Sequence, residues 1–98
     1  MTRRFRLSNQ AEADLDEIGL YTKDNWGAGQ AEKYLTQLDQ TFHVLAQTPS
    51  LGQDCSDLRP GLLSITCNRH IIFFRRNAAG TVEILRILHQ RMDFQRHL

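Results

Sequence analysis

The stretch "LLSITCNRHIIFFRRNAAGTVEILRIL", residues 62–88, decides the fold. It holds three short runs rich in β-branched and aromatic side chains, separated by the turn-forming segments "NR" and "NAAG". We therefore expect a meander of three antiparallel strands between Leu62 and Leu88. The continuous apolar run Ile71–Phe74 favours burial of the middle strand on both faces, whereas Ser64 and Thr66 indicate a wetter face on its neighbour.

Upstream of this stretch, the apolar residues recur at steps of three and four, which predicts two amphipathic helices. The first stripe consists of Ala11, Leu15, Ile18, Thr22 and Trp26, and the second of Ala31, Leu35, Leu38, Phe42 and Leu45. Ser8 or Asn9 can cap the first helix, and Pro49 ends the second. The short interruption around Gly27 makes the pair a helical hairpin that extends from Ser8 to about Thr48.

The remaining segments complete an α+β fold. "RRFRLS", residues 3–8, alternates in the manner of a half-buried strand, and "SLGQDCSDLRPG", residues 50–61, is rich in turn formers and is expected to be a loop. The order β-α-α-β-β-β predicts a helical hairpin packed on a mostly antiparallel sheet. At 98 residues, we expect one domain over residues 1–98.

Composition narrows the class of protein. No apolar run approaches the roughly 18 residues of a membrane helix, and the basic start is not followed by a signal-peptide core, so we expect a cytoplasmic chain without membrane association. Cys55 and Cys67 fit no metal or redox spacing and are expected to be reduced. The four histidines have neither close pairing nor cysteine neighbours, so we expect no metal and no cofactor.

Charge is divided unevenly along the chain. Residues 1–58 hold five Lys or Arg and nine Asp or Glu, whereas residues 59–98 hold seven and two. Clustered positive charge attracts acidic or anionic partners. Alternatively, the acidic half simply pairs with the basic half inside one domain.

Several spaced motifs together resemble one known family. They are "ADLDEI" at 13–18, "LRPGL" at 58–62, "RHIIFFR" at 69–75 and "ILRILHQRMD" at 84–93. In this order they resemble the ParE toxins of the RelE/ParE superfamily of type II toxin–antitoxin systems, and the likeness covers nearly the whole chain. The resemblance implies the same β-α-α-β-β-β fold, a growth-inhibiting toxin, a ParD-type antitoxin that neutralises it, and DNA gyrase as the usual target.

The superfamily also contains ribonucleases that cut messenger RNA on the ribosome. Such cleavage needs a base, an acid and a cation in one place. His89 and Arg86 can supply base and cation, but Gln90 follows the histidine, and every lysine and tyrosine falls in the helical hairpin, away from the meander by the expected layout. We therefore favour inhibition by binding over RNA cleavage. A non-toxic interaction module is the third alternative.

Two sets of residues are candidates for binding. The end of the last strand and the tail carry a run of basic side chains with Asp93 as the only acidic residue among them. We assign this run to binding of the toxin's target. Its residues are Arg86, His89, Arg91 and Arg96, with His97 beside them. Arg86 lies inside the strand, so it can instead pair with a carboxylate.

For the antitoxin, we assign two apolar residues that point away from the helical stripes, Leu20 and Val44. Basic strand surface would add attraction for an acidic antitoxin tail. No direct sequence-specific DNA binding is expected.

Overall fold

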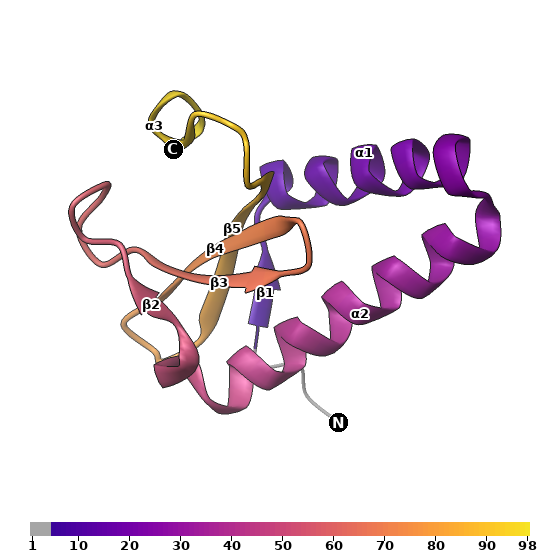
Figure 1. Ribbon diagram of the computed structural model, residues 1–98. Helices are drawn as coiled ribbons and strands as arrows, with labels where there is room; N and C mark the ends of the chain where they lie inside the picture. Colours follow the sequence, from indigo (N-terminus) through magenta and orange to yellow (C-terminus); the bar gives the residue numbers. More distant parts are fainter. Residues whose placement is uncertain (1–4) are drawn as a thin grey trace.

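The computed structural model describes residues 5–98 and shows a helical hairpin packed on one face of a five-stranded sheet (Figure 1). The elements in chain order are β1 (Phe5–Leu7), α1 (Asn9–Trp26), α2 (Ala28–Gln47), the 3-10 helix η1 (Pro49–Leu51), β2 (Gln53–Asp54), β3 (Leu63–Cys67), β4 (His70–Arg76), β5 (Val82–His89) and α3 (Phe94–His97). The predicted α+β class, the hairpin and the three-strand meander are confirmed. Arg3 and Arg4, also assigned to the first strand, lie outside the described residues.

The sheet has the order β1-β5-β4-β3-β2, and only the β1–β5 pair is parallel. β1 thus lies beside the last strand of the chain, β5. β1 covers only half of β5, because its register ends at Leu7 against Ile84. The β4–β5 register shifts between Phe73 and Phe74, so Leu85 is an extra residue on β5 at the point where β1 ends.

The middle strand β4 is buried on both faces, as its apolar run predicts. On the hairpin side, Ile72 and Phe74 pack with Leu38, Phe42 and other helix residues in the main core. On the opposite side, a smaller core of Leu62, Phe73 and Leu88 is covered by Cys55, Leu58, Phe94 and Leu98. The segment before β3 and the C-terminal turn are therefore part of the packed structure.

The α1–α2 junction is a single residue, Gly27, whose φ of 96° favours glycine. The helices meet there and diverge toward the sheet (Figure 1). Trp26 was expected in the buried stripe, but it is 67% exposed, so this prediction is wrong. The last turn of α1 lies near the tip of the hairpin, and the periodicity of a helix does not reveal how far its neighbours extend.

Two further expectations fail. Residues 50–61 are not purely a loop, because they contain η1 and the edge strand β2, whose residues pair with β3 through the backbone although both are exposed. Ser64 is buried and not on a wetter face; its hydroxyl lies 3.1 Å from Cys55 Sγ, which satisfies the polar group. Thr66 is exposed, as expected.

Within residues 5–98, no helix is long and apolar enough to cross a bilayer. Both cysteines are free thiols.

Candidate binding surfaces

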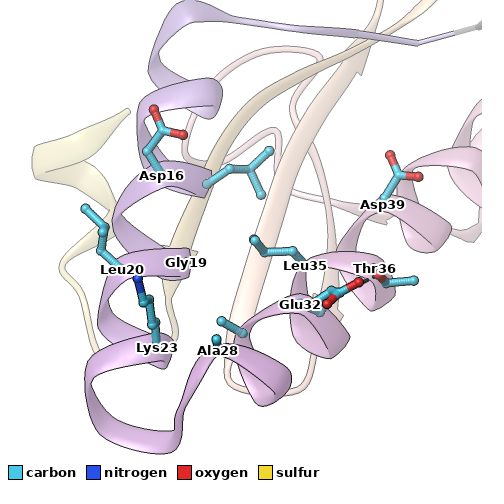
Figure 2. A pocket seen from close by; sticks show the side chains of 11 residues that line it. Asp16, Gly19, Leu20, Lys23, Ala28, Glu32, Leu35, Thr36 and Asp39 are labelled. Carbon is cyan, nitrogen blue, oxygen red and sulfur yellow. Dashed lines mark hydrogen bonds between the residues drawn. The ribbon is translucent and has the colours of Figure 1, made fainter.

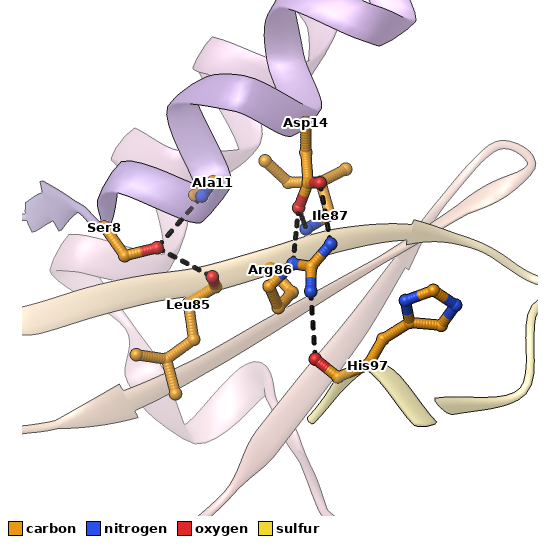
Figure 3. A network of polar contacts seen from close by, with 7 residues as sticks. All are labelled: Ser8, Ala11, Asp14, Leu85, Arg86, Ile87 and His97. Atoms are coloured by element: carbon orange, nitrogen blue, oxygen red, sulfur yellow. Dashed lines mark hydrogen bonds and ion pairs between the residues drawn. The ribbon is translucent and has the colours of Figure 1, made fainter. Parts of the chain in front are cut away.

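β1 leaves the second half of the β5 edge unpaired. Side chains from the N-terminal part of α1 and its cap form hydrogen bonds with the backbone there (Figure 3). Ser8 caps α1 by accepting a hydrogen bond from the Ala11 N–H, and its own hydroxyl donates to the Leu85 carbonyl at 2.7 Å. Asp14, only 8% exposed, accepts from the Ile87 N–H at 2.9 Å. These two side chains thus satisfy backbone groups of β5 beyond the end of β1.

Asp14 also forms a two-pronged ion pair with Arg86. Its Oδ2 and Oδ1 accept from Nε and Nη2 of the guanidinium, each at 2.9 Å, and the two side chains are 9% and 17% exposed. The hydrogen bonds that Arg86 donates to Asp14 raise the pKa of Arg86, so the guanidinium stays charged. The remaining Nη1 donates to the His97 carbonyl at 2.9 Å, which connects the pair to α3 (Figure 3). Arg86 therefore pairs with a carboxylate, which is the structural alternative that the sequence left open.

The other assigned basic residues lie at the end of β5 and in the tail. Arg91 and Arg96 are exposed, and among residues 5–98 neither guanidinium has a hydrogen-bond or ion-pair partner. The tail that carries them is fixed, because Phe94 and Leu98 pack on the smaller core and Asp93 caps α3 through the Gln95 N–H. This part of the surface therefore presents two free cations on an ordered turn.

A groove of about 850 Å³ lies between the two helices (Figure 2). Its apolar lining includes Leu15, Leu20 and Leu35, and Gly19 allows the helices to approach, since a Cβ there would lie 3.3 Å from Leu35. Three carboxylates, of Asp16, Glu32 and Asp39, line it against one ammonium, of Lys23. The groove is therefore apolar with an acidic border.

Leu20 and Val44 are 62% and 47% exposed, which confirms that both point away from the core. Only Leu20 lines the groove. Val44 lies outside the lining, five residues beyond Asp39 on α2, which is about 7.5 Å along a helix, so the two apolar residues are not brought together in one site.

A second cleft of about 630 Å³ lies between the helices, the β3–β4 turn and the end of β5. Here the Tyr34 hydroxyl lies 2.6 Å from His70 Nδ1 and 3.1 Å from the Cys67 carbonyl, and the His70 ring packs edge-on against the His89 ring. The expectation that the tyrosines and lysines lie away from His89 is wrong for three of these four residues, the exception being Lys23 in the helical groove. Tyr21, Lys33 and Tyr34 line the same cleft as His89, because the β3–β4 turn folds back onto α2.

Burial shapes the chemistry of this cleft. Desolvation lowers the pKa of His70, and the neighbouring His89 lowers it further. Desolvation also raises the pKa of Tyr34 to about 12, so at neutral pH its hydroxyl keeps its proton.

Sequence reasoning missed the residues that hold these surfaces together. Asp14 resembles any acidic residue of an exposed helix face, and its burial depends on the position of β5. Tyr34 and His70 meet only through the packing of α2 on the β3–β4 turn. The one available signal was that Asp14, His70 and Arg86 all lie inside the motifs that carry the family resemblance.

Comparison with known proteins gives a consistent result. Residues 5–94 match the family model described as ParE toxin of type II toxin-antitoxin system, parDE. Toxin ParE1 of Mycobacterium tuberculosis (strain CDC 1551 / Oshkosh) is 41% identical over 98 residues, covering 100% of both chains. Toxin ParE1 of Caulobacter vibrioides is 39% identical over 96% of each chain, and Toxin ParE of Escherichia coli is 37% identical over 96% of this chain and 91% of its own.

The fold also has a solved counterpart. A chain of the chromosomal ParDE TA system from P. aeruginosa superposes with a TM-score of 0.76 at 24% identity, covering 87% of this chain and 92% of its own.

Removing either partner of the buried ion pair should destabilise the fold. Asp14→Ala leaves the partly buried Arg86 without a countercharge and the Ile87 N–H without an acceptor, so we expect a loss of about 2–4 kcal/mol in the free energy of unfolding. Arg86→Ala should lower the free energy of unfolding by about 3 kcal/mol. The double variant should lower it by clearly less than the sum of the two single losses. Urea denaturation measures all three. Additive losses would show that the two residues do not depend on each other.

His70 should make stability dependent on pH. Its pKa is depressed in the folded chain, so its contribution is fully present above the unfolded value of about 6.5 and is lost as pH falls through the folded value. The groups that face it are Tyr34 on α2, His89 on β5 and Asp14 on α1.

Between pH 7 and 5, His70→Gln should therefore lose less stability than the wild type in chemical denaturation. His97→Gln, at an exposed position, is the matched control for loss of a histidine. Parallel stability curves for His70→Gln and the wild type over this range would contradict the assignment.

Proposed function

The chain belongs to the ParE toxin family of type II toxin–antitoxin systems, and on that premise we propose that it arrests growth by binding DNA gyrase and is neutralised by a ParD-type antitoxin. The observation that carries the target assignment is the pair of unpartnered cations, Arg91 and Arg96, on the ordered tail. Guanidinium groups form two-pronged bonds with carboxylates and phosphates, so an acidic gyrase surface and a gyrase–DNA complex both fit. His89 stays a candidate contact at the boundary between tail and cleft.

Binding fits the side chains better than RNA cleavage does. A general acid for the leaving oxygen should have a pKa near the working pH. Tyr34, the hydroxyl closest to the histidines, has a pKa of about 12 and is already bonded to His70 or the Cys67 carbonyl. The case against cleavage thus rests on the raised pKa of Tyr34 and no longer on a separation between the tyrosines and His89.

For the antitoxin, the groove between the helices is the proposed docking site, with Leu20 as its anchor. Its acidic border favours an amphipathic segment that carries lysine or arginine beside its apolar face. Val44 would be a separate apolar contact farther along α2. Attraction of an acidic antitoxin tail to the basic strand surface stays a prediction.

Growth arrest on induced expression, rescued by coexpression of a ParD-type antitoxin, tests the toxin assignment. In arrested cells and with purified gyrase, we expect impaired supercoiling and intact transcripts. Shortened transcripts that become intact again in His89→Ala would make the chain a ribonuclease. Normal growth despite a folded, expressed chain would instead support an interaction module without toxicity.

Arg91→Ala and Arg96→Ala should each weaken gyrase binding by roughly tenfold, as expected for loss of one charge-assisted bond, and should reduce growth arrest. Arg76→Ala removes another exposed arginine, at the far end of β4, and is the control. Antitoxin binding should persist in all three. An equal loss of gyrase affinity in the control would show that the effect comes from the net charge and not from contacts of Arg91 and Arg96. Point variants are preferable to truncation after Met92, which would remove Phe94 and Leu98 from the smaller core.

Leu20→Glu should weaken antitoxin binding by roughly 30-fold or more, because a charge would replace an apolar anchor. Leu51→Glu is the matched control, since this leucine is 54% exposed and lies outside the groove. Calorimetric titration with the antitoxin measures both. Unchanged affinity in Leu20→Glu would remove the groove from the interface.

A further inference from the structure

The second cleft differs from the helical groove in both charge and composition. Its described lining contains no carboxylate, but it includes Lys33 on α2 and Arg69 in the β3–β4 turn. The two cavities share no residue, although the same two helices contribute to both. An anionic ligand would therefore meet attraction in the cleft and repulsion at the acidic border of the groove.

Aromatic rings are the second feature of the cleft. Tyr21 and Trp26, on the last turns of α1, are 66% and 67% exposed although they line a cavity. Deeper in, the rings of Tyr34, His70 and His89 follow one another with centroids 5.5 and 5.4 Å apart. Large exposed rings beside cations offer flat surfaces on which a planar ligand can stack.

The wall that carries Arg69 is held in place. The Asn68 amide donates to Gln37 Oε1 at 3.0 Å, which fastens the β3–β4 turn to α2. The Arg69 carbonyl accepts from the Gln90 N–H at 3.0 Å, which fastens the same turn to the end of β5. The cation is thus presented from a fixed backbone, which lowers the entropy cost of binding.

The hydrogen bonding of His89 determines which of its ring nitrogens can donate. His89 Nδ1 accepts from the Arg91 N–H at 3.2 Å, so the neutral ring carries its proton on Nε2. The cleft therefore combines two cations, one of them on a fastened turn, with an imidazole N–H donor and exposed rings.

From this combination we propose that the second cleft binds single-stranded nucleic acid, with Lys33 and Arg69 on phosphates and Tyr21 and Trp26 stacked on bases. Free phosphate would use the cations alone. Duplex bases are already stacked on one another and would leave the rings unused. The inference does not depend on gyrase as the toxic target and assigns no reaction to the site.

Trp26 is the only tryptophan of the chain, so its fluorescence reports directly on the cleft. The purified full-length chain is titrated at low salt with a ten-nucleotide oligo-dT, the same length of oligo-U, a blunt DNA duplex and inorganic phosphate. Both single strands should quench the fluorescence of Trp26. Comparison of their two Kd values distinguishes DNA from RNA as the tighter ligand. The duplex should bind at least about tenfold more weakly, and phosphate should compete only at millimolar concentration.

Matched variants separate the site from general charge. Lys33→Gln and Arg69→Gln should each raise the Kd for the single strand roughly fivefold to tenfold and make the salt dependence shallower by about 0.7 in log–log slope. Tyr21→Ala should raise the Kd about tenfold through lost stacking. Lys23→Gln, which removes an equal charge from the helical groove, should change neither Kd nor slope.

Absence of Trp26 quenching at low salt would overturn the proposal. So would equal effects of Lys23→Gln and Lys33→Gln, or a duplex that binds as tightly as the single strands.

Discussion

The carboxylate of Asp14 is the constraint on which the rest of the structure depends. β1 ends at Leu7, opposite Ile84, so the second half of β5 needs partners for its backbone from elsewhere. Asp14 supplies one to Ile87 and at the same time neutralises Arg86, whose remaining donor holds the C-terminal turn. A single buried side chain thus connects the first helix, the last strand and the tail. Because buried ion pairs contribute little net stability compared with apolar packing, its role here is to fix geometry.

That geometry separates three surfaces with different chemistry. The groove between the helices is apolar and acidic, the tail is basic and exposed, and the second cleft is basic and aromatic. The uneven charge along the sequence therefore reflects a real division of the surface, although Asp14 and Arg86 also pair across it. Under the proposed function, separate surfaces would allow the contacts with the antitoxin and with the target to change independently.

Local rules predicted the elements well. The three- and four-residue steps of α1 and α2 and the β-rich runs of the meander are short-range signals, and they predicted the hairpin and the three-strand meander but not the place of β1 beside β5. They failed where distant segments decide the outcome. Ser64 is buried because Cys55 comes to lie against it, and Tyr34 reaches His70 because the β3–β4 turn folds onto α2. The exposure of Leu20 followed from a helical wheel, whereas the groove around it required the relative position of two helices.

The most direct test of the role of Asp14 is amide hydrogen exchange by NMR in Asp14→Ala, which removes both the acceptor of the Ile87 N–H and the countercharge of Arg86. The account predicts that the Ile87 amide and the Leu98 amide of the C-terminal turn lose protection together, while the Ile72 amide in the centre of the sheet keeps it. Wild-type protection at Ile87 and Leu98 would contradict the claim that this one side chain holds the edge of β5 and the tail in place.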